Sequence, residues 1–131
     1  SETRMAYLNH IGLTHKDLQM QAIGPIVFNE QLFYFKEVMP DDKIRVSFEL
    51  AGMSEEGTFF AFEHNYYNQA GENVARCEMM GAWMHLKTRK LTTLPLELIT
   101  QFKAANKAEG YQILTPEDTR KHGRTPKNLN L

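Results

Sequence analysis

Three neighbouring side chains, Glu63, His64 and Asn65, offer the most direct set of groups for catalysis. A carboxylate, an imidazole and an amide could together move protons and hold a polar intermediate. They lie in the aromatic stretch 59–67, which is typical of a β-strand. Because successive side chains of a strand point to opposite faces, His64 is expected on the face opposite Glu63 and Asn65. An ordinary strand surface is therefore favoured over a catalytic group.

The one cysteine, Cys77, is a second possible nucleophile. His85 lies eight residues further along the same predicted strand, which is roughly 26 Å away at the rise of a β-strand. A thiol–imidazole pair between these two residues is therefore excluded within one subunit, and Cys77 is expected to be a small buried apolar residue. A single cysteine also excludes an internal disulfide and fits a reducing compartment.

Histidines give no indication of a metal site. A metal-binding pair needs two histidines at ligand spacing on one helix or hairpin, and the sequence contains no such pair. The five histidines stand at positions 10, 15, 64, 85 and 122. We therefore expect no metal site.

The bulk composition is typical of one ordinary domain. The chain has 131 residues, of which 42% are hydrophobic and 24% charged, and its formal net charge is −1. This charge does not favour nucleic acid or anionic membranes as partners. No apolar run approaches the roughly eighteen residues of a membrane span, and no charged-then-apolar leader opens the chain. We expect a cytoplasmic protein.

Strands dominate the middle of the chain. Runs of β-branched and aromatic residues between turn signals predict four of them, over 26–35, 43–50, 59–67 and 74–86. The last run has almost no charge after Glu78, which predicts a central strand that is covered on both sides. Within it, Gly81 predicts a bulge or a close approach by another element. Gly71 predicts a hairpin turn between the last two strands.

Helices are predicted at both ends of the chain. The first covers 1–11 and is followed by a helical turn or loop over 14–20, and the second begins after Pro95 and ends at Gly110. The remaining stretch, 115–131, is polar and basic and is predicted to be a tail. Eleven residues of helix rise roughly 16 Å, whereas four or five strands span about 20 Å, so the first helix is too short to cover the sheet.

Several motifs, in this order, resemble the hotdog-fold acyl-CoA thioesterases of the 4-hydroxybenzoyl-CoA thioesterase type. The run FNEQLFYFKEVMPDDKIRVSFEL, at 28–50, resembles two strands of that family and the turn between them. The places of the family's Tyr, basic residue, Pro and turn Asp are filled by Tyr34, Lys36, Pro40 and Asp42. Asp41 stands where the family has Gly. The run from 62 to 95 resembles the family's next hairpin, its closing strand and its Leu-Pro exit.

The resemblance covers about residues 1–100 and implies an α+β hotdog fold. In this fold an antiparallel sheet wraps around a central helix, and the present chain would add a C-terminal helix and a polar tail. The implied division is a hotdog domain over 1–110, incomplete at its N-terminus, and a tail over 111–131. Glu2 and Arg4 resemble a Glu-x-Arg pair inside the family's central helix. On this expectation the chain begins about halfway along that helix.

The family's catalytic Asp is therefore expected upstream of Ser1. Glu2 is the alternative carboxylate within this sequence, because another hotdog branch uses a helix Glu. The simpler interpretation of Glu2 is an exposed helix pair with Arg4. In the family, helix N-terminal amides also supply the oxyanion donors that thioester hydrolysis needs.

Coenzyme A carries phosphates that need cations. Four residues are expected to bind the substrate in this way: Lys36, Lys87, Arg89 and Lys90. The rival interpretation of 87–90 is a solvated basic turn, and the tail offers further cations at Arg120, Lys121, Arg124 and Lys127. An apolar acyl pocket could be lined by Met79, Met80, Met84, Phe60 and Phe62, although a core or interface role is the simpler interpretation.

The function implied by the resemblance is hydrolysis of an acyl-CoA to the free acid and coenzyme A, without metal or redox cofactor. The alternative from another class is a hotdog module that binds an acyl thioester, or serves as a structural subunit, without hydrolysing it. A hydratase or dehydratase is disfavoured because its hydration signature is absent from the sequence. A homodimer or homotetramer is expected, joined through the edge of the closing strand.

Overall fold

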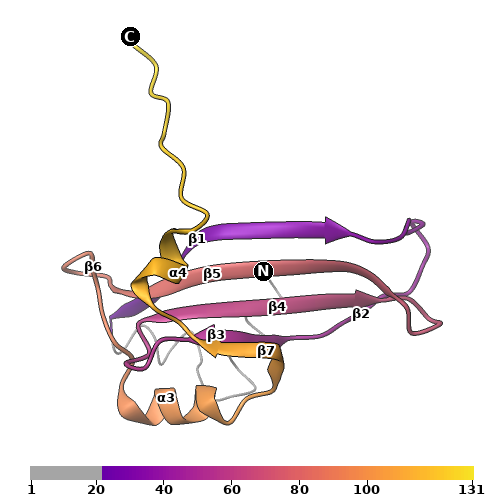
Figure 1. Cartoon of the computed structure of the whole chain (residues 1–131), viewed down its shortest axis with the longest axis horizontal. Helices are drawn as coiled ribbons and strands as arrows, with labels where there is room; N and C mark the ends of the chain where they lie inside the picture. The colour runs from indigo at the N-terminus through magenta and orange to yellow at the C-terminus, as the bar shows by residue number, and fades with distance from the viewer. Residues whose placement is uncertain (1–21) are drawn as a thin grey trace.

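The computed structural model describes residues 22–131, and one sheet of seven strands forms most of it (Figure 1). The strands are β1 (Ile23–Tyr34), β2 (Arg45–Val46), β3 (Glu49–Met53), β4 (Phe59–Tyr67), β5 (Asn73–His85), β6 (Lys90–Leu91) and β7 (Lys107–Ile113). Two helices follow the long strands, α3 (Leu96–Lys103) and α4 (Pro116–Arg120). The predicted helix over 1–11 and the turn over 14–20 lie outside the described residues.

The main strands lie in the order β1-β5-β4-β3-β7. Each neighbouring pair is antiparallel except β3 and β7, which run parallel. The sheet is therefore mixed, and the expectation of a purely antiparallel sheet was wrong at this one edge. Parallel pairing is possible here because α3 provides the crossover that brings the chain back to β3.

The strand predictions agree with the structure to within a few residues, with one exception. The predicted strand over 43–50 is split into β2 and β3, and β3 continues to Met53. The predicted terminal helix was also too long, because α3 ends at Lys103 and the chain up to Gly110 belongs largely to β7. In residues 107–113, pairing with the open edge of β3 outweighs the helical periodicity of the sequence. Gly110 has a positive φ within this strand, a backbone conformation that glycine adopts readily. The division at residue 110 stays a prediction, and β7 runs across it.

The closing strand β5 lies inside the sheet, as its apolar composition predicts. It pairs with β1 on one side and with β4 on the other along most of its length. It therefore has no free edge, and the expectation that two subunits join through the edge of this strand was wrong. Among the described strands, β1 is at one edge of the sheet and β7 at the other.

Gly81 has the role that its position within a strand predicts. It faces Val27 on β1, beside a register shift between Val27 and Asn29. A Cβ atom at Gly81 would collide with the carbonyl oxygen of Ile26 and would lie 2.7 Å from the ring of Phe60. Only glycine allows β1 to approach β5 this closely.

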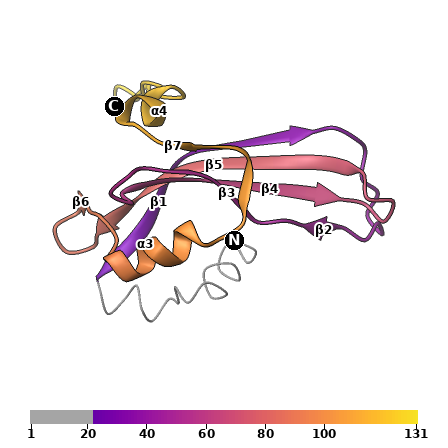
Figure 2. The same ribbon diagram turned by 60° about the horizontal axis from the view of Figure 1, so that its bottom comes forward.

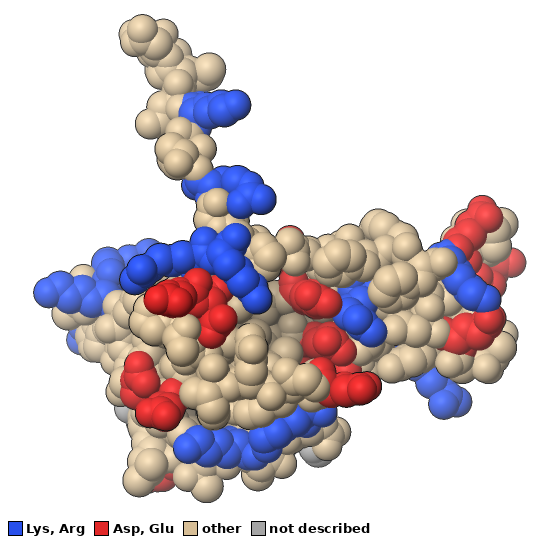
Figure 3. All heavy atoms as spheres, in the orientation of Figure 1, with Lys and Arg blue, Asp and Glu red and all other residues tan. Residues whose placement is uncertain are grey.

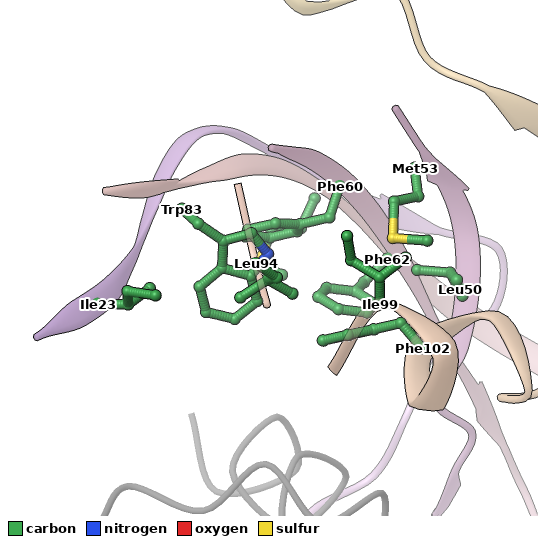
Figure 4. Packing of buried hydrophobic residues seen from close by; sticks show 10 residues of the cluster. Ile23, Leu50, Met53, Phe60, Phe62, Trp83, Leu94, Ile99 and Phe102 are labelled. Carbon is green, nitrogen blue, oxygen red and sulfur yellow. The ribbon is translucent and has the colours of Figure 1, made fainter. Parts of the chain in front are cut away.

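One face of the sheet, the core face, carries the hydrophobic core (Figure 4). Phe60, Phe62 and Met79 point from β4 and β5 to this face, and α3 covers them with Ile99 and Phe102. The rings pack edge to face or tilted, with the Phe62 and Phe102 centroids 6.0 Å apart. Trp83 adds a further ring 5.9 Å from Phe102. We call this part of the core face, around Trp83, the closed end.

The opposite face, the polar face, bears charged side chains. Glu63, Asn65, Arg76 and Glu78 alternate with the core residues along β4 and β5. Figure 2 shows that α4 lies on the side of the sheet opposite α3. A contact from Gln31 Nε2 to His122 Nδ1, at 3.5 Å, links the segment after α4 to β1. Among residues 22–131, none of the helices has the length and apolar character that a membrane span needs.

Candidate functional site

The structure separates the three residues that first suggested catalysis. His64 is buried on the core face, where its ring lies 4.3 Å from that of Phe48 and its Nδ1 donates to the Ser47 carbonyl at 3.2 Å. Glu63 and Asn65 point to the polar face, where the Asn65 amide donates to the Glu63 carboxylate at 2.7 Å. The prediction from strand alternation is confirmed, so these residues do not act as one acid–base group.

Asn65 is the centre of a polar network on the polar face. Its Nδ2 also donates to Glu49 at 2.8 Å, so one amide ties together carboxylates from β3 and β4. Its Oδ1 accepts from Arg76 Nε at 2.7 Å and from Asn73 Nδ2 at 3.0 Å. The Asn65 side chain is buried, and every one of these bonds satisfies a polar group that would be costly to leave unpaired.

This network lines a polar cavity of about 350 Å³. Its carboxylates outnumber its cations, because Arg76 is the only basic residue among the described residues that line it. Arg76 lies 3.8 Å from Glu63 and 4.0 Å from Glu78, so its charge is shared. The cavity could hold water or a small polar group, and the carboxylates of Glu49 and Glu63 are held by the Asn65 amide rather than aimed at an apolar substrate.

Cys77 and His64 form a pair of neighbours that the sequence reasoning missed. They are directly opposite each other on β5 and β4, both on the core face. The Cys77 thiol also donates toward Glu30 Oε1 at 3.7 Å. The signal was the hairpin turn at 68–72, because counting outward from that turn brings residues 64 and 77 together. Cys77 is buried, as predicted.

An apolar pocket lies at the other end of the core face, where the Ala75 end of β5 meets the end of β1. We call this the open end. The pocket has a volume of about 750 Å³. Its described lining consists of Leu32, Tyr34, Phe35, Lys36, Glu37, Val38, Ile44, Tyr66, Val74 and Ala75. A concave, mainly apolar site of this size is typical of a small-molecule site.

The cations predicted to bind coenzyme A fall into two separate groups. Lys36 follows β1 at the open end, where it forms an ion pair with Glu72 of the β4–β5 hairpin. Lys36 also donates a hydrogen bond to the Glu72 carboxylate, and together with a second hydrogen bond from Asn68 it holds the pKa of Glu72 below its ordinary value of 4.5. The turn 87–90 lies at the opposite end of the sheet, beyond the pairing of Ile23 with His85. The length of β1, roughly 36 Å, separates the two groups.

All four of these predicted cations are exposed, as are the basic residues of the tail. Figure 3 shows Lys and Arg gathered around α4 and along the C-terminal tail. Lys36 and the turn 87–90 cannot contact one phosphate group within a subunit. Any shared role would have them at different ends of the substrate or in different subunits.

The residues proposed for an acyl pocket do not line the apolar pocket among its described residues. Phe60, Phe62 and Met79 belong to the hydrophobic core at the closed end and middle of the sheet. Met80 points to the polar face, where it lines a separate cavity of about 190 Å³. The simpler interpretation, a core role, is correct for the first three. Glu2, Arg4 and the histidines at 10 and 15 lie outside the described residues. Residues 22–131 contain no group of His, Cys, Asp and Glu that could hold a metal ion.

Comparison with known proteins places this geometry in a family. Residues 1–102 match the thioesterase-like superfamily. A search of curated proteins gave no significant match. Among solved structures, a hypothetical protein from Staphylococcus aureus in complex with CoA superimposes with a TM-score of 0.71 at 18% identity, over 95% of this chain and 77% of that chain.

Two further structures are similar. A 1,4-dihydroxy-2-naphthoyl-CoA thioesterase from Synechocystis has a TM-score of 0.67 at 14% identity, over 79% of this chain and 75% of that one. The 12:0-ACP thioesterase from Umbellularia californica has a TM-score of 0.70 at 15% identity, over 98% of this chain, which spans about half (49%) of the plant protein. These similarities confirm the hotdog fold that the sequence motifs predict.

Proposed function

The chain belongs to the thioesterase-like superfamily, and from this premise we propose that it hydrolyses an acyl-CoA thioester to the free acid and coenzyme A. The observation that carries the proposal is the family match over residues 1–102, on a hotdog sheet with an open apolar pocket beside it. Water supplies the oxygen that bonds to the acyl carbon, the carbon–sulfur bond breaks, and the leaving thiolate takes a proton.

The 4-hydroxybenzoyl-CoA thioesterase type is the branch that we propose. The turn after β1 supports it, because Pro40 and Asp42 fill the family's places there. The Asp42 carboxylate accepts from the backbone N–H of Met39 at 2.8 Å, and the Asp42 N–H donates to the Met39 carbonyl at 3.0 Å. Both bonds close a tight turn. This turn forms with Asp41 at the position where the family has glycine.

For the reacting carboxylate we keep the two assignments of the family resemblance: an Asp upstream of Ser1, or Glu2. Glu2→Gln tests the second assignment, with Arg4→Gln as the matched control for a merely structural helix pair. If Glu2 is the carboxylate, E2Q abolishes turnover and R4Q does not. Full turnover by E2Q would remove Glu2 from the reaction.

The turn 87–90 is our proposed phosphate contact. It follows β5, and Arg89 has a positive φ of 60°, which turns the chain sharply between β5 and β6. Changing Lys87 and Arg89 to Ala should raise KM for an acyl-CoA about tenfold or more, since each lost charge-assisted bond is worth about 1.5–3 kcal/mol. KM for a short thioester without nucleotide should not change. The pair R124A/K127A tests the tail as the alternative contact.

We propose that two copies associate through β1. This strand is at the edge of the described sheet and, outside the apolar pocket, exposes the apolar side chains of Val27, Phe28 and Phe33. Light scattering should give at least twice the monomer mass of 15.2 kDa. Phe33→Lys should shift the protein toward the monomer, whereas Gln69→Lys at the exposed β4–β5 turn should not. A stable monomer for the unchanged chain would contradict this assembly.

The deciding experiment is thiol release from a panel of acyl-CoA thioesters, with calorimetric binding of a non-hydrolysable acyl-CoA thioether measured in parallel. Turnover of at least one thioester supports the hydrolase. Binding of the thioether without turnover of any thioester would instead favour the non-catalytic acyl-thioester module. Cell fractionation tests the proposed cytoplasmic location.

A further inference from the structure

The apolar pocket at the open end contains a row of three side chains in register. Ala75 on β5 is directly opposite Tyr34 on β1 and directly opposite Tyr66 on β4. Directly opposed residues share a face of the sheet, so all three belong to the core face. The row therefore alternates large, small and large across three neighbouring strands.

This row gives the pocket the shape of a slot. Neighbouring strands lie about 4.8 Å apart, so the backbones that carry the two tyrosines are about 10 Å apart. Between them, Ala75 provides the floor, and it is buried although its neighbour Tyr34 is 76% exposed. A larger side chain at Ala75 would rise between the two tyrosines and occupy the space that alanine leaves.

The chemistry of the slot suits an uncharged apolar group. Leu32, Val38 and Ile44 complete its walls with aliphatic side chains. Of the two charged residues in the described lining, Lys36 is already paired with Glu72, and Glu37 would repel an anion. A charged acyl group would lose its hydration here without gaining a free partner. An alkyl or aryl group gains burial and contact with aromatic faces.

We propose that this slot binds the acyl group of the thioester and that Ala75 sets the largest acyl group that the protein accepts. Because the turn 87–90 of the same subunit lies at the other end of β1, the phosphates of that thioester would meet the turn 87–90 of a second copy. The inference rests on the proposed hydrolase function, and it names an uncharged, apolar acyl group as the substrate class. The volume of about 750 Å³ lies within the roughly 300–1,000 Å³ of small-molecule sites. The concave shape favours a small ligand over a second copy, because the exposed apolar side chains of β1 outside the pocket, Val27, Phe28 and Phe33, already provide a surface for that copy.

The test uses the full chain and the variants Ala75→Phe and Ala75→Val, with Ala70→Phe at the exposed hairpin turn as the matched control. Far-UV circular dichroism and thermal melting first establish that each variant folds, and A75V serves if A75F does not fold. kcat/KM is measured for acetyl-, butyryl-, octanoyl-, dodecanoyl-, benzoyl- and succinyl-CoA. Binding of the octanoyl-CoA thioether is measured by calorimetry, with coenzyme A alone as reference.

We expect A75F to lower kcat/KM for the largest acyl groups about tenfold or more relative to acetyl-CoA, because methylene-sized changes in an apolar pocket alter discrimination by this much. A75V should lower kcat/KM for the largest acyl groups by a smaller factor than A75F does. A70F should leave kcat/KM unchanged for every acyl-CoA. The unchanged protein should discriminate against succinyl-CoA.

Two outcomes would overturn the inference while leaving the proposed function intact. In the first, A75F and A75V lower kcat/KM equally for all acyl lengths. In the second, they change only the dimer mass, which would assign the slot to a second copy. If no thioester is hydrolysed but Ala75 still controls thioether affinity relative to coenzyme A, the hydrolase proposal fails and the acyl site stands.

Discussion

The two ends of the core face are built from the same strands but are held in place in different ways. At the closed end, α3 covers Trp83, Phe60 and Phe62 with its own aromatic side chain, and all of these side chains are almost completely buried. At the open end no described helix lies over Tyr34 and Ala75, and a pocket remains. The closed end is stabilised by burial on the core face, whereas the open end is held from behind, by the network around Asn65 on the polar face.

This difference shows how one sheet can combine a rigid part with an accessible part. Polar bonds behind the open end fix β3, β4 and β5 without filling the space in front of them. An apolar cover would stabilise the sheet more, but it would close the pocket. Substitutions at the two ends should therefore have very different costs.

Phe102→Ala should have the largest effect. Phe102 is 1% exposed and contacts both Phe62 and Trp83, so its removal should lower the free energy of unfolding by about 3–5 kcal/mol. Tyr34→Ala at the open end should cost far less, because Tyr34 is mostly exposed. Urea unfolding of both variants measures the difference. Equal losses would contradict the distinction between the two ends.

Gly81→Ala should come next. The added Cβ atom meets the backbone oxygen of Ile26, which cannot move without shifting β1, so we expect a loss of about 1–3 kcal/mol. Gly24→Ala is the matched control, because its Cβ would meet only the flexible end of the Leu86 side chain, at 2.8 Å. The comparison requires G81A to unfold at a lower urea concentration than G24A.

Asn65→Ala tests the support behind the open end. It removes the shared donor of Glu49 and Glu63 together with the acceptor of Arg76 and Asn73, at a cost of about 1–3 kcal/mol. Asn128→Ala in the exposed tail provides the control. Amide hydrogen exchange should show faster opening of β3 and β4, with the closed end of β5 unchanged. Uniform acceleration along the whole of β5 would mean that the two ends are not held separately.

Glu72→Gln should have the smallest effect, because its ion pair with Lys36 is exposed to solvent. The folded-state pKa of Glu72 is depressed, so its contribution is fully present above the ordinary value of 4.5 and is lost as pH falls through the lowered folded pKa. The melting temperatures of wild type and E72Q should therefore differ slightly at neutral pH and converge in acid. A difference in melting temperature that grows as pH falls would contradict the lowered pKa of Glu72.

The sequence predicted the centre of the sheet well, because local patterns determine it. Alternation assigned His64 to one face and Asn65 to the other, and an uncharged run marked β5 as central. The site was less predictable. Lys36 and the turn 87–90 were predicted to serve one role as cations for coenzyme A, yet they lie at opposite ends of β1. Their separation depends on strand register, which a list of residue types does not contain.

The Tyr34–Ala75–Tyr66 row escaped prediction for the same reason. An alanine in a strand carries no functional signal by itself, and only pairing with two other strands reveals it as a floor between tyrosines. Strand β7 also depends on pairing, because Gly110 and its neighbours have a weak preference of their own and adopt an extended form against β3.

The pairing of β7 with β3 has a consequence for the folding of the protein during its synthesis. β3 and β7 are joined in the sheet although Leu50 and its partner Lys107 are 57 residues apart in the chain. During synthesis, β3 leaves the ribosome long before β7 does, at about 5–20 residues per second. For several seconds the β3 edge of the sheet in a nascent chain therefore has unpaired backbone N–H and C=O groups. An unpaired strand edge of this kind can pair with another chain and start aggregation, and it is a place where chaperones act. This edge of the sheet is therefore completed only once residues 107–113 have been synthesised.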